Sequence, residues 1–237
     1  MKIYFLIVAF FITVTVQSQN GIGSWNTLNV NVKIHKKWSI FAEGQVRSLL
    51  FYNNFHYYEV KGGGVFKLTN NFSLTSGIGS YNTYGENGNF QIPMQNKEIR
   101  TWLQINIKQP IGRVLFENRY RMEQRFTSNG YRNRYRIRVG ATIPINEPVI
   151  KPKTIYAIGW NELFFTNNEP FFERNRSFMG VGYELNESLA MQIGYIYQFD
   201  YKINDETGRD FLQMGYFIEL FRKKSSRKTI DTDLKDN

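Results

Sequence analysis

Hydrophobic and polar residues alternate along most of the chain. Between Ile99 and Ile107 every second residue is apolar or threonine, and Arg100, Gln104 and Asn106 are among the residues between them. Successive side chains of a β-strand point to opposite faces, so a period of two predicts strands. Because the same alternation recurs from Leu28 to Leu220, we predict an all-β protein.

Eleven segments show the alternation: residues 28–34, 38–46, 58–68, 72–80, 98–108, 114–125, 132–143, 154–165, 174–185, 189–199 and 211–220. Short turns are expected at 35–37, 69–71, 109–112 and 186–188, with a proline-bearing link at 144–153. Longer polar loops are expected at 49–57, 83–97, 126–131, 166–173 and 200–210. Short turns on one rim and long loops on the other are typical of a transmembrane, antiparallel, up-and-down β-barrel.

The number of strands is harder to predict than the fold. Bacterial single-chain membrane barrels have even numbers of strands, whereas eleven segments are visible. Residues 21–27, or a hairpin inside the loop 83–97, would supply a twelfth strand; one unpaired segment would leave ten. We predict about twelve strands, with ten as the alternative.

The two faces of the predicted strands differ in charge. The apolar face carries no Asp, Glu, Lys or Arg in any of the eleven segments, whereas the other face is rich in charged residues, with basic ones in excess. A soluble barrel with its apolar face inward would enclose a cavity larger than side chains can fill. We therefore predict an apolar wall facing lipid and a charged lumen, and keep a soluble periplasmic barrel as the alternative.

The first residues read as an export signal. Met1 and Lys2 precede an apolar run at residues 3–16, and Ser18 ends a short small-residue pattern. The run is too short for a spanning helix but typical of a secretory signal peptide. We predict a cleaved signal peptide at residues 1–18, a barrel at 19–221 and a polar C-terminal tail at 222–237.

Composition excludes several kinds of chemistry. The 237 residues include no cysteine and two histidines, and the net charge is +10. Disulfides, thiolate metal sites and cysteine nucleophiles are therefore excluded. His35 falls in a short turn and His56 in a long loop, on opposite rims. We predict no catalytic residues, no metal site, no cofactor and no enzymatic activity.

The strongest cluster of candidate functional residues is a ladder of inward arginines. It comprises Arg119, Arg121, Arg125, Arg132, Arg134, Arg136, Arg138 and Arg176. The candidate lumen carboxylates are Glu43, Glu59, Glu98, Glu117, Glu123, Glu162 and Glu184. Arginine is permanently charged and binds carboxylate or phosphate oxygens with two parallel donors. The ladder predicts either a charge network that fills a narrow barrel or a path for anionic solutes.

Several short motifs, in this order, resemble those of a known family. They are W-N-T-L at 25–28, W-S-I-F-A-E-G-Q-V-R at 38–47, F-E-N-R-Y-R at 116–121, R-N-R-Y-R-I-R at 132–138, F-E-R-N-R at 172–176 and G-Y-I-Y-Q at 194–198. The chain resembles the DUF2490 family of outer-membrane proteins, common in Bacteroidetes-type bacteria. The resemblance implies a barrel in the outer membrane and no established activity. The residues after Phe221 depart from the strand-terminal aromatic with which many such barrels end.

We therefore expect a protein of the bacterial outer membrane, with lipid as its partner, small anionic solutes as possible ligands and no nucleic acid. Its role would be structural, or that of a narrow pore with anion preference. An outer-membrane enzyme acting on lipid is the contrasting hypothesis. The sequence leaves the solute and the oligomeric state open.

Overall fold

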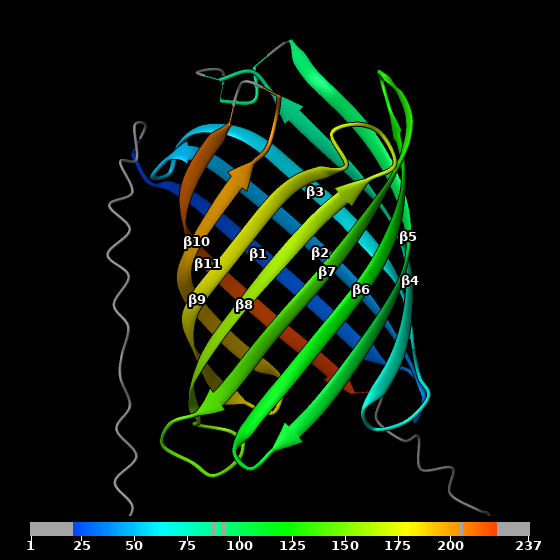
Figure 1. Cartoon of the computed structure of the whole chain (residues 1–237). Helices are drawn as coiled ribbons and strands as arrows, with labels where there is room; N and C mark the ends of the chain where they lie inside the picture. The colour runs from blue at the N-terminus through cyan, green and yellow to red at the C-terminus, as the bar shows by residue number, and fades with distance from the viewer. Residues whose placement is uncertain (1–20, 87–88, 92, 204–205, 222–237) are drawn as a thin grey trace, which may run out of the picture.

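The computed structural model describes residues 21–86, 89–91, 93–203 and 206–221. They form eleven β-strands that close into one barrel (Figure 1). The strands are β1 Gly23–Lys33, β2 Trp38–Leu50, β3 Asn53–Lys67, β4 Phe72–Tyr84, β5 Met94–Ile111, β6 Val114–Thr127, β7 Gly130–Pro144, β8 Ile155–Thr166, β9 Phe172–Asn186, β10 Leu189–Asp200 and β11 Thr207–Phe221. The predicted all-β barrel is confirmed.

The barrel closes with a parallel pair of strands. Each strand pairs antiparallel with its neighbour in sequence, but β1 and β11 run in the same direction, from Gly23 opposite Phe211 to Lys33 opposite Phe221. An odd number of up-and-down strands leaves the first and last strands parallel. The predicted antiparallel pairing is therefore wrong at the closing pair.

The structure has eleven strands, close to the predicted twelve. Residues 21–27 were one of two candidates for the twelfth strand; residues 23–27 are instead the first half of β1 and continue without a break to Lys33. Between the end of β4 at Tyr84 and the start of β5 at Met94, the described residues form no further strand.

The two rims are named here by the chain ends. The N-terminal rim, where β1 begins, carries the links 51–52, 85–93, 128–129, 167–171 and 201–206; the C-terminal rim, where β11 ends, carries 34–37, 68–71, 112–113, 145–154 and 187–188 (Figure 1). Two expected long loops, 49–57 and 126–131, are short turns between long strands. At a rim, water reaches both faces of a strand. The strand can therefore continue there without the alternation of apolar and polar residues.

The outward face of the barrel is apolar and the inward face is charged. On the outside Val60, Leu103 and Met179 are 61%, 60% and 76% exposed. On the inside Glu123 and Glu162 are fully buried. This is the reverse of a soluble barrel and agrees with the predicted assignment of the two faces.

One side of the lumen is filled by an apolar cluster. Trp25 of β1, Phe178 of β9, Ile196 of β10 and Phe211 of β11 are almost fully buried and contact one another, and Trp160 packs against them. The period-two pattern did not reveal this cluster, because its members occupy the face that is otherwise polar. The charged side chains occupy the remaining part of the lumen.

Glycines on the inner face make room for large aromatic rings. Gly77 of β4 lies opposite Trp102 of β5, and a Cβ added to Gly77 would lie 2.2 Å from the Trp102 ring. Gly182 has the same relation to Tyr156, at 2.1 Å. The narrow interior is thus packed by pairing a ring with a residue that has no side chain.

The predicted signal peptide at 1–18 and the predicted tail at 222–237 lie outside the described residues. Within the part of the chain that the structure describes, no helix is long and apolar enough to cross a bilayer.

Candidate functional site: an arginine-lined lumen

A cavity of about 950 Å³ occupies the lumen. Its lining includes Thr166 and Tyr201 near the N-terminal rim, and Glu117 and Phe217 nearer the C-terminal rim. The cavity therefore follows much of the barrel axis, and most of the charged inward side chains face it.

The register of β6 and β7 creates the arginine ladder. The pairs directly opposite each other are Arg119 and Arg138, Arg121 and Arg136, Glu123 and Arg134, and Arg125 and Arg132. Like charges directly opposite each other destabilise a sheet. The ladder therefore requires carboxylates beside it, on β6 itself and on other strands.

Glu162 of β8 supplies one of these carboxylates and is fully buried. Its oxygens accept hydrogen bonds from Arg119 at 2.5 Å, from Arg136 at 2.9 Å and from Arg138 at 2.8 Å. Charge-assisted hydrogen bonds of this kind are stronger than neutral ones. A single carboxylate thus holds three guanidinium groups.

Glu123 of β6 has a similar role and is also fully buried. It accepts a hydrogen bond from Arg136 at 2.7 Å, and nitrogens of Arg121 and Arg100 lie 3.4 Å and 3.7 Å from its oxygens. Because Arg136 binds both Glu123 and Glu162, the two clusters form one network.

Glu173 and Glu98 bind the end of the ladder nearer the N-terminal rim. Glu173 forms ion pairs with Arg125 at 3.3 Å and Arg132 at 3.2 Å, and a closer one with Arg134. Glu98 binds Arg100 at 2.8 Å and closely contacts Arg125.

Glu173 falls in the predicted loop 166–173 and is not among the predicted lumen carboxylates. In the structure Phe172 pairs with Phe165 and Arg174 with Phe164, so Glu173 is the additional residue of a β-bulge in β9. A bulge re-aims a side chain that simple alternation would turn outward. Here it directs the Glu173 carboxylate to the ladder.

Arginines outnumber carboxylates in this network. The arginines are Arg100, Arg119, Arg121, Arg125, Arg132, Arg134, Arg136 and Arg138, and the carboxylates are Glu98, Glu123, Glu162 and Glu173. Eight guanidinium groups against four carboxylates leave a formal excess of four positive charges beside the cavity.

Aromatic faces stabilise part of this excess. The guanidinium carbon of Arg138 lies 3.7 Å from the ring centre of Trp160, and that of Arg100 lies 3.8 Å from Tyr81. The quadrupole of an aromatic ring attracts a cation that lies over its face. Even so, the Nε atoms of Arg119 and Arg138 are buried without a hydrogen-bond acceptor.

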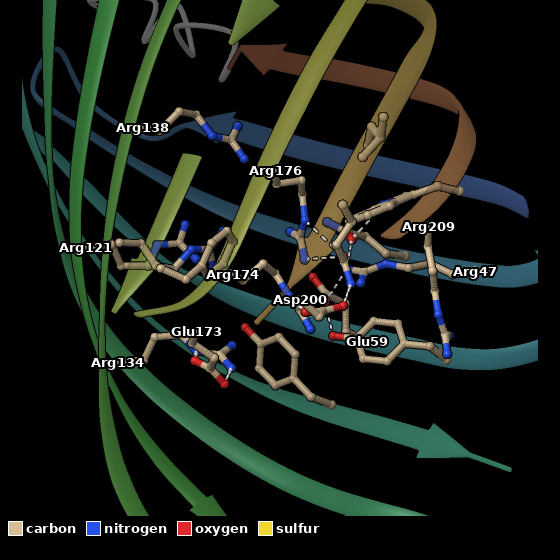
Figure 2. Close-up of a pocket in the computed structure, with 18 of the residues that line it drawn as sticks. Arg47, Glu59, Arg121, Arg134, Arg138, Glu173, Arg174, Arg176, Asp200 and Arg209 are labelled. Atoms are coloured by element: carbon tan, nitrogen blue, oxygen red, sulfur yellow. Dashed lines mark hydrogen bonds and ion pairs between the residues drawn. The ribbon is translucent and has the colours of Figure 1, made fainter. Parts of the chain in front are cut away.

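A second group of charged residues lies near β1–β3 and β9–β10. Figure 2 shows Arg47, Arg174 and Arg176 extending toward the same part of the cavity. Arg174 closely contacts Asp200, and Nη2 of Arg47 lies 3.4 Å from Glu59. The ion pair with Asp200 was not anticipated from the sequence.

All eight predicted arginines line the cavity, as do Glu43, Glu59, Glu98 and Glu117. Glu123 and Glu162 lie behind the arginines that they bind. Glu117 does not serve the ladder as expected: it is 45% exposed and lies 3.8 Å from Lys108. Glu184, on β9 near the C-terminal rim, does not line the cavity.

The two histidines lie far from each other. His35 is in the turn 34–37 of the C-terminal rim. His56, expected in a loop, is near the start of β3 and lines the cavity, and its Nδ1 has no hydrogen-bond partner. Among the described residues, no three His, Asp or Glu side chains are grouped as a metal site would need.

Comparison with known proteins identifies the family but no activity. No curated protein and no solved structure matches the chain. The model of the DUF2490 family, described as a protein of unknown function, matches residues 22–209. The match extends from the start of β1 into β11 and includes every arginine and carboxylate of the network. The chain therefore belongs to the DUF2490 family.

Proposed function

We propose that this protein is a β-barrel of the bacterial outer membrane, and that its lumen is a narrow path for small anions. The excess of arginine over carboxylate beside the cavity is the observation that carries this proposal. A charged, low-dielectric channel raises the local concentration of ions of opposite sign. Anions would be concentrated in the lumen and cations repelled.

The outer surface supports the membrane location. Apolar side chains around the wall are exposed, among them Ile78 at 57%, Val139 at 53% and Ile193 at 48%. Soluble monomers rarely expose large continuous apolar patches. Aromatic side chains near the strand ends, such as Trp38 and Tyr131, are also exposed, as in the aromatic girdles of membrane barrels.

A planar bilayer containing the purified barrel tests the proposal. Under a gradient of potassium chloride, the reversal potential should show that chloride is preferred over potassium. The preference should weaken at high salt, because the Debye length falls to about 3 Å at 1 M. A folded barrel that passes no current, or one that prefers potassium, would contradict the proposed path.

Variants of the more exposed arginines locate the selectivity. Arg132 and Arg138 have side chains that are 37% and 24% exposed, whereas Arg134 is 4% exposed and tightly paired. Arg132→Gln and Arg138→Gln together should reduce the chloride preference without unfolding the barrel. Lys97→Gln, which removes one positive charge from the outward face of β5, is the control for each single substitution and should leave the preference unchanged.

The lack of enzymatic activity stays a prediction. A lipid-hydrolysis assay of the wild-type protein and of His35→Ala and His56→Ala tests it. Hydrolysis that either substitution abolishes would favour the hypothesis of a lipid-degrading enzyme.

A further inference from the structure

We propose that Arg176, together with Arg47 and Arg174, forms a binding site for one small oxyanion, a carboxylate or a phosphate group. The site faces the same cavity as the ladder but is built by β2 and β9, with β1 and β10 beside it (Figure 2). The inference rests on the proposed function in one respect: the lumen must admit anions.

The charges in this part of the lumen do not balance. The cations are Arg47, Lys61, Arg174 and Arg176, and the carboxylates bound to them are Glu43, Glu59 and Asp200. Lys61 binds Glu43 at 2.6 Å and Glu59 at 2.5 Å. Four cations against three carboxylates leave one positive charge.

Arg176 carries that charge. It is 5% exposed, and its Nε and Nη2 donate to a neutral acceptor, Oε1 of Gln198, at 3.2 Å and 2.8 Å. Within the described part of the chain, no carboxylate lies within 4 Å of its guanidinium nitrogens. Burial of a charge without an opposite charge is costly, so an anion bound here would remove an existing penalty.

The nearest alternative carboxylate is already used. Glu162 lies directly across from Arg176 in the β8–β9 pair. Its two oxygens, however, accept hydrogen bonds from Arg119, Arg136 and Arg138 of the ladder. The described residues therefore leave Arg176 without an ion-paired carboxylate.

Arg47 lies beside Arg176 and is also incompletely hydrogen-bonded. It is 8% exposed, and its Nε has no hydrogen-bond acceptor. Its guanidinium carbon lies 3.4 Å from the ring centre of Trp25, and that of Arg176 lies 4.8 Å from the same ring. One tryptophan thus contacts both guanidinium groups, and the two cations are held close together.

The arrangement favours an oxyanion over a halide. Each guanidinium presents parallel N–H donors that match two oxygens of one carboxylate or phosphate. Two guanidinium groups that share one ring can donate to different oxygens of the same ligand. A halide has one acceptor atom and would satisfy fewer of these donors.

Binding is measured on the full-length barrel, purified in detergent, by calorimetric titration at constant ionic strength. Sodium phosphate and sodium acetate are the two test ligands, and sodium chloride is the comparison. At least one oxyanion should saturate the protein and bind about tenfold more tightly than chloride, as expected when a charged hydrogen bond is gained. Chloride binding as tightly as both oxyanions would overturn the proposal.

Two substitutions test the site itself. Arg176→Gln removes the unbalanced charge and should weaken oxyanion binding by about tenfold or more. Gln198→Glu keeps the size of the side chain and gives Arg176 an internal carboxylate, so it should abolish oxyanion binding. The variant also replaces the amide that donates to Asp200 at 2.6 Å with a like charge, so its folding is checked before binding is measured. The second variant tests the proposal even if the first does not fold. Unchanged binding in a folded form of either variant would overturn it.

Matched controls separate this site from the ladder. Arg132→Gln removes the same charge elsewhere in the cavity and should leave oxyanion affinity unchanged. Lys97→Gln, which removes a positive charge from the outward face of β5, should also leave oxyanion affinity unchanged.

The two proposals fail in different ways. If oxyanion binding depends on Arg176 but the barrel passes no current, the result contradicts the anion path and supports the binding site. If the barrel passes an anion-selective current but shows no oxyanion binding that depends on Arg176, the result overturns the binding site and supports the anion path.

Discussion

At the scale of single residues, the network depends on a few carboxylates that each bind several arginines. Glu162 is the clearest case, because its side chain is fully buried and holds three guanidinium groups. Replacing a buried ion pair with apolar groups can be neutral, but removing one partner leaves uncompensated buried charge.

We therefore expect Glu162→Gln to lower the free energy of unfolding by about 3–5 kcal/mol, because Arg119, Arg136 and Arg138 lose their shared anion. Denaturant unfolding in lipid vesicles, followed by tryptophan fluorescence, measures the change. Glu117→Gln is the control: its ion pair with Lys108 is half-exposed, and its loss should cost about 1 kcal/mol or less. Equal costs at both positions would contradict the described network.

The sequence predicted the inward arginines but not how they pair. Alternation shows that a side chain faces inward, which was enough for Arg134 and Arg136. It does not show which groups meet across the lumen: Glu117 and Glu162 were predicted alike as lumen carboxylates, but Glu162 binds the ladder and Glu117 pairs with Lys108. It also fails where a bulge adds a residue, which is why Glu173 was missed.

At the scale of strands, the inner face is fitted by pairing rings with glycines. We expect Gly77→Ala to destabilise the barrel by about 1–3 kcal/mol, since overpacking a filled interior costs this much. The added methyl group would overlap the buried ring of Trp102. Gly44→Ala is the control on the outer face, where an added Cβ meets no atom within 4 Å; its stability should be close to wild type in the same unfolding experiment.

The outer face of β5 permits a test of depth in the membrane. Leu103→Arg would place a charge near the middle of the strand and should lower the stability in lipid vesicles by about 2–4 kcal/mol. Ile111→Arg makes the same change at the end of the strand, where the cost should be about 0–1 kcal/mol. The two side chains are similarly exposed, at 60% and 63%, so a soluble barrel would tolerate both equally.

Strand prediction succeeded wherever one face is apolar and the other polar along the whole segment. It failed at the strand ends, as at residues 49–57, where a register shift next to Ser48 and the run from Leu49 to Tyr52 interrupt the alternation. It also failed to join residues 23–27 to β1. Trp25 and Thr27 face the lumen there, and an inward tryptophan does not fit a pattern of polar inward residues.

At the scale of the whole molecule, the odd number of strands places the start of β1 and the end of β11 on opposite rims (Figure 1). Since the chain has no cysteine, single cysteines can test this arrangement. Ile22→Cys should react with a membrane-impermeant maleimide from the same side of the membrane as Asn129→Cys. Lys36→Cys should react only from the other side. Ile22→Cys reacting together with Lys36→Cys would contradict the parallel closure.

The pairing of the first strand with the last one also determines when the barrel can close. The first strand in the sequence finds its second partner only in the last one, so the sheet keeps two unpaired edges until β11 is in place. Unpaired edges invite pairing with other chains, and contacts between distant parts of a chain form slowly. We therefore expect a nascent or truncated chain to leave its arginines and carboxylates in water, and these groups to be sealed from solvent only when the final strand joins the first.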